Sequence, residues 1–175
     1  MKKDDKLLVS KIENGTVIDH INSGRALVVL KILNIKGNEG YRIAIVMNVP
    51  STTMGKKDIV KLEDYYPNSE DLEKISLISP NATINIIKNY EIVKKYKVEI
   101  PSKIRGTLKC NNPTCITRKS NEPITSSFTL LSKDKIKLQC DYCGSILTEE
   151  DIIKELIGDS QWALFAVIYM IIEDF

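Results

Sequence analysis

Apolar and polar residues near the start of the chain follow first a strand pattern and then a helix pattern. The stretch "GTVIDHI" begins at a turn glycine and predicts a strand over residues 15–21. In "NSGRALVVLKIL" apolar side chains recur at helical spacing, and Asn22 or Ser23 can cap the first free amides. We therefore expect a helix over residues 23–34.

The following segments continue this alternation. The β-branched runs at 41–49 and 58–64 predict a buried strand and a second strand, with a loop between them. Residues 69–79 open with a capping Asn or Ser and acidic residues and end before a proline, which predicts a second helix. Residues 82–101 contain two strand stretches broken near an asparagine.

The predicted order is β-α-β-β-α-β with one further strand, which is typical of a ferredoxin-like split βαβ sandwich, an α+β fold. With four or five strands and two helices, residues 1–100 can bury one core. The sequence therefore predicts an N-terminal domain over residues 1–100.

A second, smaller unit is expected over residues 101–150. The stretches "ITSSFTLLS" and "KIKLQC" flank Lys133 and Asp134, which predicts a hairpin with a two-residue turn. Together with "IRGTLKC" they form a small antiparallel β domain, too small to be stable without a metal.

All four cysteines lie in this second unit, with the spacing C-x4-C-x24-C-x2-C: Cys110, Cys115, Cys140 and Cys143. Two close pairs separated by a longer run are how a structural zinc site is built from two knuckles. Two disulfides or four reduced thiols are the alternatives. The charged start "MKKDDKLLVS" is not a secretory signal, so we expect a cytoplasmic protein, in which disulfides are disfavoured.

Four thiolates would close a tetrahedral Zn²⁺ site and leave no position for water or substrate. The sequence also contains no P-loop, nucleophile elbow or dinucleotide glycine motif. Nothing in the sequence therefore supports a stand-alone enzyme.

Charge is unevenly distributed along the chain, although the net charge is only +2. Residues 1–100 carry +3, residues 101–147 carry +5 and residues 148–175 carry −6. A basic module of this kind suits either nucleic acid or an acidic protein surface.

Residues 151–175 form an apolar C-terminal extension with helical character. Within it "DIIKELIG" continues an amphipathic helix, and "WALFAVIYMII" is a run of eleven apolar or aromatic residues. A bilayer span needs about 20 such residues, so a buried helix is favoured. An interfacial membrane anchor is the alternative, but the acidic flanks disfavour it, and we expect no membrane partner.

The chain has one histidine, His20, which follows Asp19. An Asp-His pair is compatible with half of a catalytic triad, a metal site, an anion-binding corner or a polar strand end. Lys57 or Lys61, together with one of the later lysines Lys94 and Lys95, can converge with His20 on one sheet face and bind a polyphosphate. From spacing alone, solvated lysines remain the favoured alternative.

Four stretches, in order, resemble the regulatory chain of aspartate carbamoyltransferase over about residues 5–150. They are "GTVIDHI", "VPSTTMGKKDIVKLE", "SPNATINIIKNYEIV", and the cysteine pattern with "CNNPTC" and "CDYCG". The resemblance implies a non-catalytic subunit that controls pyrimidine nucleotide biosynthesis. Its N-terminal domain would bind the effectors CTP and ATP, with UTP as a further candidate, and its zinc domain would dock on the catalytic chain.

The resemblance also implies a nucleotide site. Backbone groups of residues 9–12 would line the base, Asp19 would hold the ribose and His20 would contact phosphate. Lys57 and Lys61 match the family's paired lysines. The full set of implied nucleotide-binding residues is Val9, Ser10, Lys11, Ile12, Val17, Asp19, His20, Lys57, Lys61, Asn85, Ile87, Tyr90, Ile92 and Lys95.

As partners, the resemblance implies trimers of the catalytic chain, bound through the zinc domain, and a regulatory-chain homodimer formed through the N-terminal domain. The alternative function is a zinc-ribbon nucleic-acid-binding protein. Residues 101–147 contain only two aromatics, Phe128 and Tyr142, which is a weak platform for base stacking. We therefore expect no nucleic-acid partner.

Overall fold

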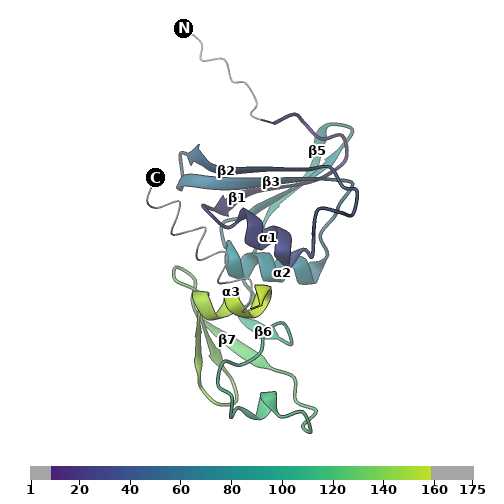
Figure 1. The fold of residues 1–175 in the computed structure, drawn as a ribbon. Coiled ribbons are helices and arrows are strands. Elements are labelled where there is room, and N and C mark those ends of the chain that lie inside the picture. Colours follow the sequence, from purple (N-terminus) through teal and green to yellow (C-terminus); the bar gives the residue numbers. More distant parts are fainter. Residues whose placement is uncertain (1–8, 159–175) are drawn as a thin grey trace.

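The computed structural model describes residues 9–158. Two antiparallel sheets lie toward opposite ends of the molecule, and three helices lie between them (Figure 1). One sheet has five strands and the other four, which confirms the predicted α+β fold class.

The N-terminal unit contains seven elements: β1 (Gly15–Asn22), α1 (Ala26–Ile32), β2 (Ile43–Ser51), β3 (Gly55–Glu63), α2 (Ser69–Ile78), β4 (Thr83–Lys88) and β5 (Glu91–Lys97). Its strand order is β2-β3-β1-β4-β5, and each neighbouring pair is antiparallel. This is the split βαβ arrangement, with β5 added at one edge.

The two faces of this sheet differ because side chains alternate along each strand. Ile18, Val60 and Ile84 are fully buried and belong to the hydrophobic cluster under α1 and α2. Their sequence neighbours point to the opposite face, which the helices do not cover. This second face, called here the open face, is where polar side chains can gather.

Two strands beside β3 are irregular at the same end of the sheet. The β1 register shifts between Ile18 and Ile21, and the β2 register shifts between Val46 and Val49. Inside these bulges His20 has φ 57° and Asn48 has φ 58°, a left-handed conformation that is uncommon for residues other than glycine.

Helix α1 is shorter than the predicted 23–34, and the predicted caps are wrong. It begins at Ala26, and neither Asn22 nor Ser23 caps it. Instead the buried Asp58 of β3 accepts the Ala26 N–H at 3.1 Å. A distant carboxylate thus takes the place of a local cap.

Helix α2 agrees closely with the prediction because its signals are local. Asn68 accepts the Asp71 N–H, and Asp71 accepts the Asn68 N–H, forming a capping box. The helix ends at Ile78, one residue before the predicted end.

The β2–β3 connection differs from the predicted loop. Strand β2 continues to Ser51 and β3 already begins at Gly55, so only residues 52–54 turn the chain. Gly55 has φ 71°, which permits this tight turn. Strand β2 is also not the buried strand expected, because it lies at a sheet edge and is half-buried or exposed along its length.

The C-terminal unit contains β6 (Lys103–Arg105), the short 3-10 helix η1 (Ile116–Arg118), β7 (Ser127–Ser132), β8 (Lys137–Cys140), β9 (Ile146–Thr148) and α3 (Glu149–Ile157). Its strand order is β6-β7-β8-β9. The β7–β8 hairpin pairs Ser132 with Lys137, so its turn has four residues rather than the predicted two. Ile136, the last residue of this turn, is buried.

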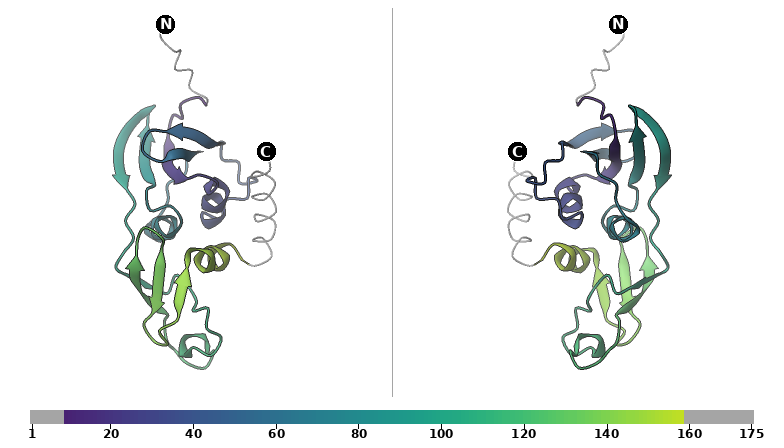
Figure 2. Two further views of the ribbon diagram at one scale, coloured as in Figure 1. Left: turned by 90° about the vertical axis from the view of Figure 1, so that its left-hand side faces the viewer. Right: turned by 90° about the vertical axis from the view of Figure 1, so that its right-hand side faces the viewer.

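Helix α3 confirms the amphipathic helix predicted after the second cysteine pair. Thr148 and Asp151 form its capping box. The helix packs on α1 and α2 (Figure 2). One hydrophobic cluster runs through both units. The apolar run "WALFAVIYMII" lies outside the described residues.

Candidate functional site

A row of four side chains crosses the open face. In the sheet register Lys61 lies opposite Val17, Val17 opposite Asn85, and Asn85 opposite Lys95. Asn85 also donates from Nδ2 to the Val17 carbonyl at 3.2 Å. Residues separated by up to 78 positions along the chain therefore form one row, in which Val17 and Asn85 lie between two lysines.

Asp19, His20 and Lys57 form a second cluster, at the β1 bulge. Lys57 Nζ lies 2.8 Å from Asp19 Oδ1 and 3.1 Å from Oδ2. Asp19 Oδ1 also accepts the His20 N–H at 2.6 Å. His20 Nδ1 is buried and makes no hydrogen bond, although it lies 3.4 Å from Asp19 Oδ2.

The His20 ring thus keeps an unsatisfied nitrogen, and its neighbour Asp19 contacts the Lys57 ammonium group. No nucleophilic serine or cysteine side chain hydrogen bonds to this pair within residues 9–158. The arrangement resembles neither half of a triad nor a metal site. It is consistent with an anion-binding corner.

The segment before β1 is fastened beside the same row. Lys61 Nζ donates to the carbonyls of Val9 and Ser10, each at 3.1 Å. Partial burial lowers the pKa of Lys61 below its ordinary value. Ile12 is buried but lies outside the cluster beneath the helices, whereas Lys11 is exposed.

The β4–β5 turn is joined to this segment by hydrogen bonds. Asn89 and Tyr90 both have positive φ, at 50° and 65°. The Tyr90 N–H donates to the Glu13 carbonyl at 2.9 Å, and the Asn89 N–H donates to Asn14 Oδ1 at 3.2 Å. Two irregular backbone stretches are therefore held near one another, and such stretches leave amides and carbonyls outside the strand ladder.

Of the residues predicted on β4 and β5, Ile87, Ile92 and Lys95 lie on the open face. Lys94, which the sequence allowed as an alternative to Lys95, lies on the other face. Ile87 is buried and pairs with the exposed Ile92. Lys95 belongs to the open face, whereas Lys94 pairs with Ile86 and its ammonium lies 5.0 Å from the Tyr96 ring centre. Lys94 is therefore excluded from the cluster that the sequence allowed it to join.

Sequence reasoning missed Asp58, a fully buried carboxylate next to Lys57. Its two oxygens accept the N–H groups of Ala26 and Asn48, at 3.1 and 2.8 Å. These bonds connect α1 and the β2 bulge to the strand that carries Lys57. A charged residue in the middle of a β-branched strand was the only available signal.

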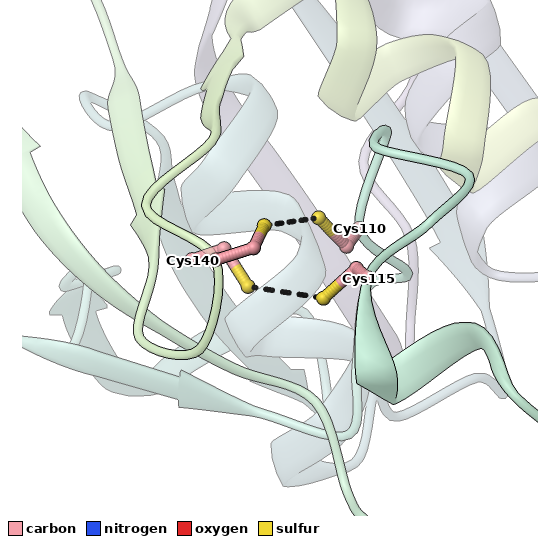
Figure 3. Close-up of side chains that lie close together, drawn as sticks. Cys110, Cys115 and Cys140 are labelled. Atoms are coloured by element: carbon pink, nitrogen blue, oxygen red, sulfur yellow. Dashed lines mark hydrogen bonds between the residues drawn. The ribbon is translucent and has the colours of Figure 1, made fainter.

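The four cysteines form the candidate metal centre. Their Sγ atoms all lie within 4.8 Å of one another, and they are the one such group of potential ligands found among residues 9–158. The Cys110–Cys143 separation is 3.5 Å and the Cys115–Cys140 separation is 3.8 Å. Figure 3 shows the labelled Cys110, Cys115 and Cys140 directed toward one centre.

Each cysteine pair is placed by a tight turn. Asn112 accepts from the Thr114 N–H, and its carbonyl accepts the Cys115 N–H. In the second pair Gly144, with φ 76°, donates its N–H to the Cys140 carbonyl.

Asp141 anchors the second knuckle to the sheet. It accepts from Ser127 Oγ at 2.5 Å, from Thr129 Oγ1 at 2.6 Å and from Lys103 Nζ at 3.3 Å. These three bonds, with the two hydroxyls the strongest contributors, lower the pKa of Asp141 to about 2. The sequence pattern of cysteines did not reveal this supporting residue.

The thiols have unequal proton affinities. Burial raises the pKa of Cys110 to about 12 and also raises the pKa of Cys140. Hydrogen bonding with Ser145 lowers the pKa of Cys143 to about 6. A cation bound at the centre must displace the protons of the buried thiols, so metal binding is coupled to proton release.

The fold and the two sites define a class: a two-unit α+β protein with a four-cysteine metal-binding module. Residues 7–99 match the family described as aspartate carbamoyltransferase regulatory chain, allosteric domain. Residues 102–153 match the family described as aspartate carbamoyltransferase regulatory chain, metal binding domain. The chain belongs to the family of aspartate carbamoyltransferase regulatory chains.

Curated relatives carry the same name, "Aspartate carbamoyltransferase regulatory chain". The chain is 54% identical over 151 residues to that of Staphylothermus marinus, covering 86% of this chain and 92% of the relative. It is 56% identical over 152 residues to that of Metallosphaera sedula, covering 87% and 96%. For Korarchaeum cryptofilum the identity is 51% over 154 residues, covering 88% and 98%.

These matches confirm the resemblance stated from the sequence and the assignment as a non-catalytic, regulatory chain. They also confirm a metal-binding domain containing the four cysteines. In the part of the chain that the structure describes, no helix is long and apolar enough to cross a membrane.

Proposed function

We propose that the chain binds nucleoside triphosphates, CTP and ATP with UTP as a further candidate, on the open face of its N-terminal sheet. This binding controls the catalytic chain of aspartate carbamoyltransferase and hence pyrimidine nucleotide synthesis. The observation that carries the proposal is the gathering of Lys57, Lys61 and Lys95 on the sheet face that the helices leave uncovered, with His20 beside the Asp19–Lys57 pair.

The phosphates require several cations, and this face supplies them. Lys57 and Lys61 are two of them, and Lys95 extends the row to the far side. Lys57 is held by Asp19, and a bound phosphate would compete with that carboxylate for the ammonium. The unsatisfied His20 nitrogen offers another polar contact.

The ribose and base need hydrogen-bonding groups at fixed positions. Asp19 can accept from ribose hydroxyls. The base edge is assigned to backbone groups of residues 9–12 and of Tyr90, two stretches that hydrogen bonds to Lys61 and Glu13 hold in place, with Val17, Ile87 and Ile92 as apolar neighbours. Among residues 9–158 no carboxylate cluster qualifies as a metal-chelating group, which suits binding without phosphoryl transfer.

The metal in the C-terminal unit is proposed to be one structural Zn²⁺. Four sulfurs about 2.3 Å from a tetrahedral zinc lie roughly 3.8 Å from one another. The observed separations of 3.5 and 3.8 Å agree with that spacing. A cytoplasmic location, where thiols stay reduced, suits such a site.

Domain roles follow from this division. Residues 1–100 serve as the allosteric domain and as the contact between two regulatory chains, through the sheet edges formed by β2 and β5. Residues 101–150 dock on catalytic trimers, and their charge of +5 favours an acidic partner surface. Phe128 is fully buried, which weakens the nucleic-acid alternative further.

Titration calorimetry of the zinc-loaded chain with CTP and with ATP tests the proposal. We expect micromolar to millimolar affinity. Lys95→Ala should weaken binding several-fold, and Lys94→Ala is the matched control because it lies next in sequence on the other face. Equal affinity in wild type and both variants would contradict the assignment of the open face. No binding at all, alone or in the complex, would contradict the proposed function.

A further inference from the structure

An ion pair joins the two units. Arg25 lies directly before α1, and Glu149 is the first residue of α3. Arg25 Nη2 lies 2.8 Å from Glu149 Oε1, and the two side chains are only 25% and 33% exposed. A pair that is partly shielded and joins separate units constrains their relative placement more than an exposed pair within one unit.

The Arg25 side of this pair is built on the same strands as the proposed nucleotide site. The Arg25 N–H donates to the Asn22 carbonyl at 3.0 Å, and Asn22 ends the strand that carries His20. The next residue, Ala26, donates its N–H to Asp58. Asp58 directly follows Lys57, which binds Asp19. The turn at Arg25 is therefore held by Asn22 on one side and by Asp58 on the other, and both lie close in sequence to proposed site residues.

The Glu149 side is built on the metal-binding sheet. Glu149 follows β9, whose Ile146 pairs with Gln139, the neighbour of Cys140. The Cys140 N–H donates to the Ser145 carbonyl at 2.8 Å, just before β9. The position of Glu149 is therefore determined by the strands that also position the second cysteine knuckle.

We infer that the Arg25–Glu149 pair couples the nucleotide site on the open face to the metal-binding domain. A phosphate that draws Lys57 away from Asp19 alters the contacts that hold the β1 bulge. The turn from Asn22 to Arg25 continues directly from that bulge and carries the change to Glu149 and α3. The inference rests on the proposed function, because it takes the open face as the site of the effector.

Such coupling must be reciprocal for binding. If nucleotide shifts the placement of α3, then docking of the metal-binding domain on its partner changes nucleotide affinity by the same factor. Residues that transmit this effect need not touch the nucleotide. Their substitution should therefore reduce the effect of nucleotide on the catalytic chain while leaving the nucleotide affinity of the isolated chain nearly unchanged.

The experiment uses the complex of the full chain with the aspartate carbamoyltransferase catalytic chain. Arg25→Gln, Glu149→Gln and the double variant are compared with wild type in two measurements: CTP and ATP affinity of the isolated full chain by calorimetry, and the nucleotide-induced shift of the half-saturating aspartate concentration of the complex. Arg42→Gln is the control, because Arg42 forms a 3.1 Å pair with Glu63 inside one unit and is 82% exposed.

We expect each single variant to reduce the shift at least about twofold, with affinity of the isolated chain within about twofold of wild type. The double variant should lose no more than either single variant, because the two residues act as one unit. Arg42→Gln should retain the full shift.

Full shifts in both single variants, or losses that add in the double variant, would overturn the inference. If the wild-type complex bound no nucleotide, the proposed function would fail first and the inference with it. The two failures are thereby distinguished.

Discussion

The two units of this chain reach a stable fold by different means. The N-terminal unit places two helices over one face of a five-stranded sheet and buries large side chains such as Leu62 and Ile75 there. The C-terminal unit has strands of three to six residues and brings four thiols to one centre. Apolar burial extends through both units, but among residues 9–158 only the C-terminal unit gathers four thiols, so we expect a metal to stabilise chiefly that unit.

This difference explains where polar chemistry is located. Because the core of the N-terminal unit lies on one side of its sheet, the open face can carry lysines and a bulge without loss of that core. In the C-terminal unit the ligating groups lie within the structure, because three of the four cysteines are buried in the same cluster as Phe128 and Leu138. We therefore expect substitutions on the open face to weaken ligand binding without unfolding the chain. Loss of the metal should instead destabilise the C-terminal unit.

Metal removal should give the largest effect. In small domains a structural zinc contributes on the order of 10 kcal/mol to folding. A strong chelator should remove hydrogen-exchange protection from β7 and β8 while β1, β3 and β4 keep theirs, as measured by mass spectrometry. Adding Zn²⁺ back is the control. Simultaneous loss of protection in both units, or in neither, would contradict the division.

Truncation in the apolar core should come next. Leu62→Ala removes a fully buried side chain and should lower the free energy of unfolding by about 2–5 kcal/mol, with metal content unchanged. Denaturant titration measures this. Leu131→Ala, at a side chain 52% exposed on β7, is the matched control and should change stability by no more than about 0.5 kcal/mol. Similar losses for both variants would argue that burial of Leu62 contributes no more to stability than an exposed leucine.

A smaller effect is expected at the lone histidine. His20→Ala should weaken nucleotide binding about tenfold, because a hydrogen bond to a charged group contributes about 1.5 kcal/mol or more. Calorimetry gives the affinity, and zinc content and assembly with the catalytic chain should stay as in wild type. An unchanged affinity would make His20 only a polar residue at a strand bulge.

The smallest effect is expected for substitution of Asp141, which anchors the second cysteine pair to the sheet. Asp141→Asn weakens the bonds to Ser127, Thr129 and Lys103, and should speed release of metal to a chromophoric chelator by no more than about tenfold. Asp134→Asn, in the exposed β7–β8 turn, is the control. Equal release rates for the two variants would show that Asp141 does not hold the knuckle.

Local signals in the sequence predicted the elements that depend on neighbouring residues. The capping box at Asn68 fixed the start of α2, and the short spacing within each cysteine pair located the metal centre. Helix α1 was misjudged because its first amide is capped by Asp58, which is 32 positions away. A hydrogen bond between residues so far apart in the sequence leaves no trace in the local spacing of apolar residues.

The candidate site was predictable in composition but not in arrangement. Alternation along β5 could not decide between Lys94 and Lys95, because the register shifts near Val93 and Ile92. The left-handed conformation of His20 depends on a bulge that forms only when β1 pairs with β3. The Arg25–Glu149 pair joins residues 124 positions apart, and no motif indicates it.

The most direct measurement of the central claim is aspartate saturation of the complex formed with the catalytic chain, with and without CTP or ATP. A coupling of about 1–3 kcal/mol should shift the half-saturating aspartate concentration by roughly 5- to 150-fold. We predict a shift that His20→Ala diminishes and that chelation abolishes by releasing the chain. Identical curves with and without nucleotide, in a complex shown to be assembled, would contradict the account.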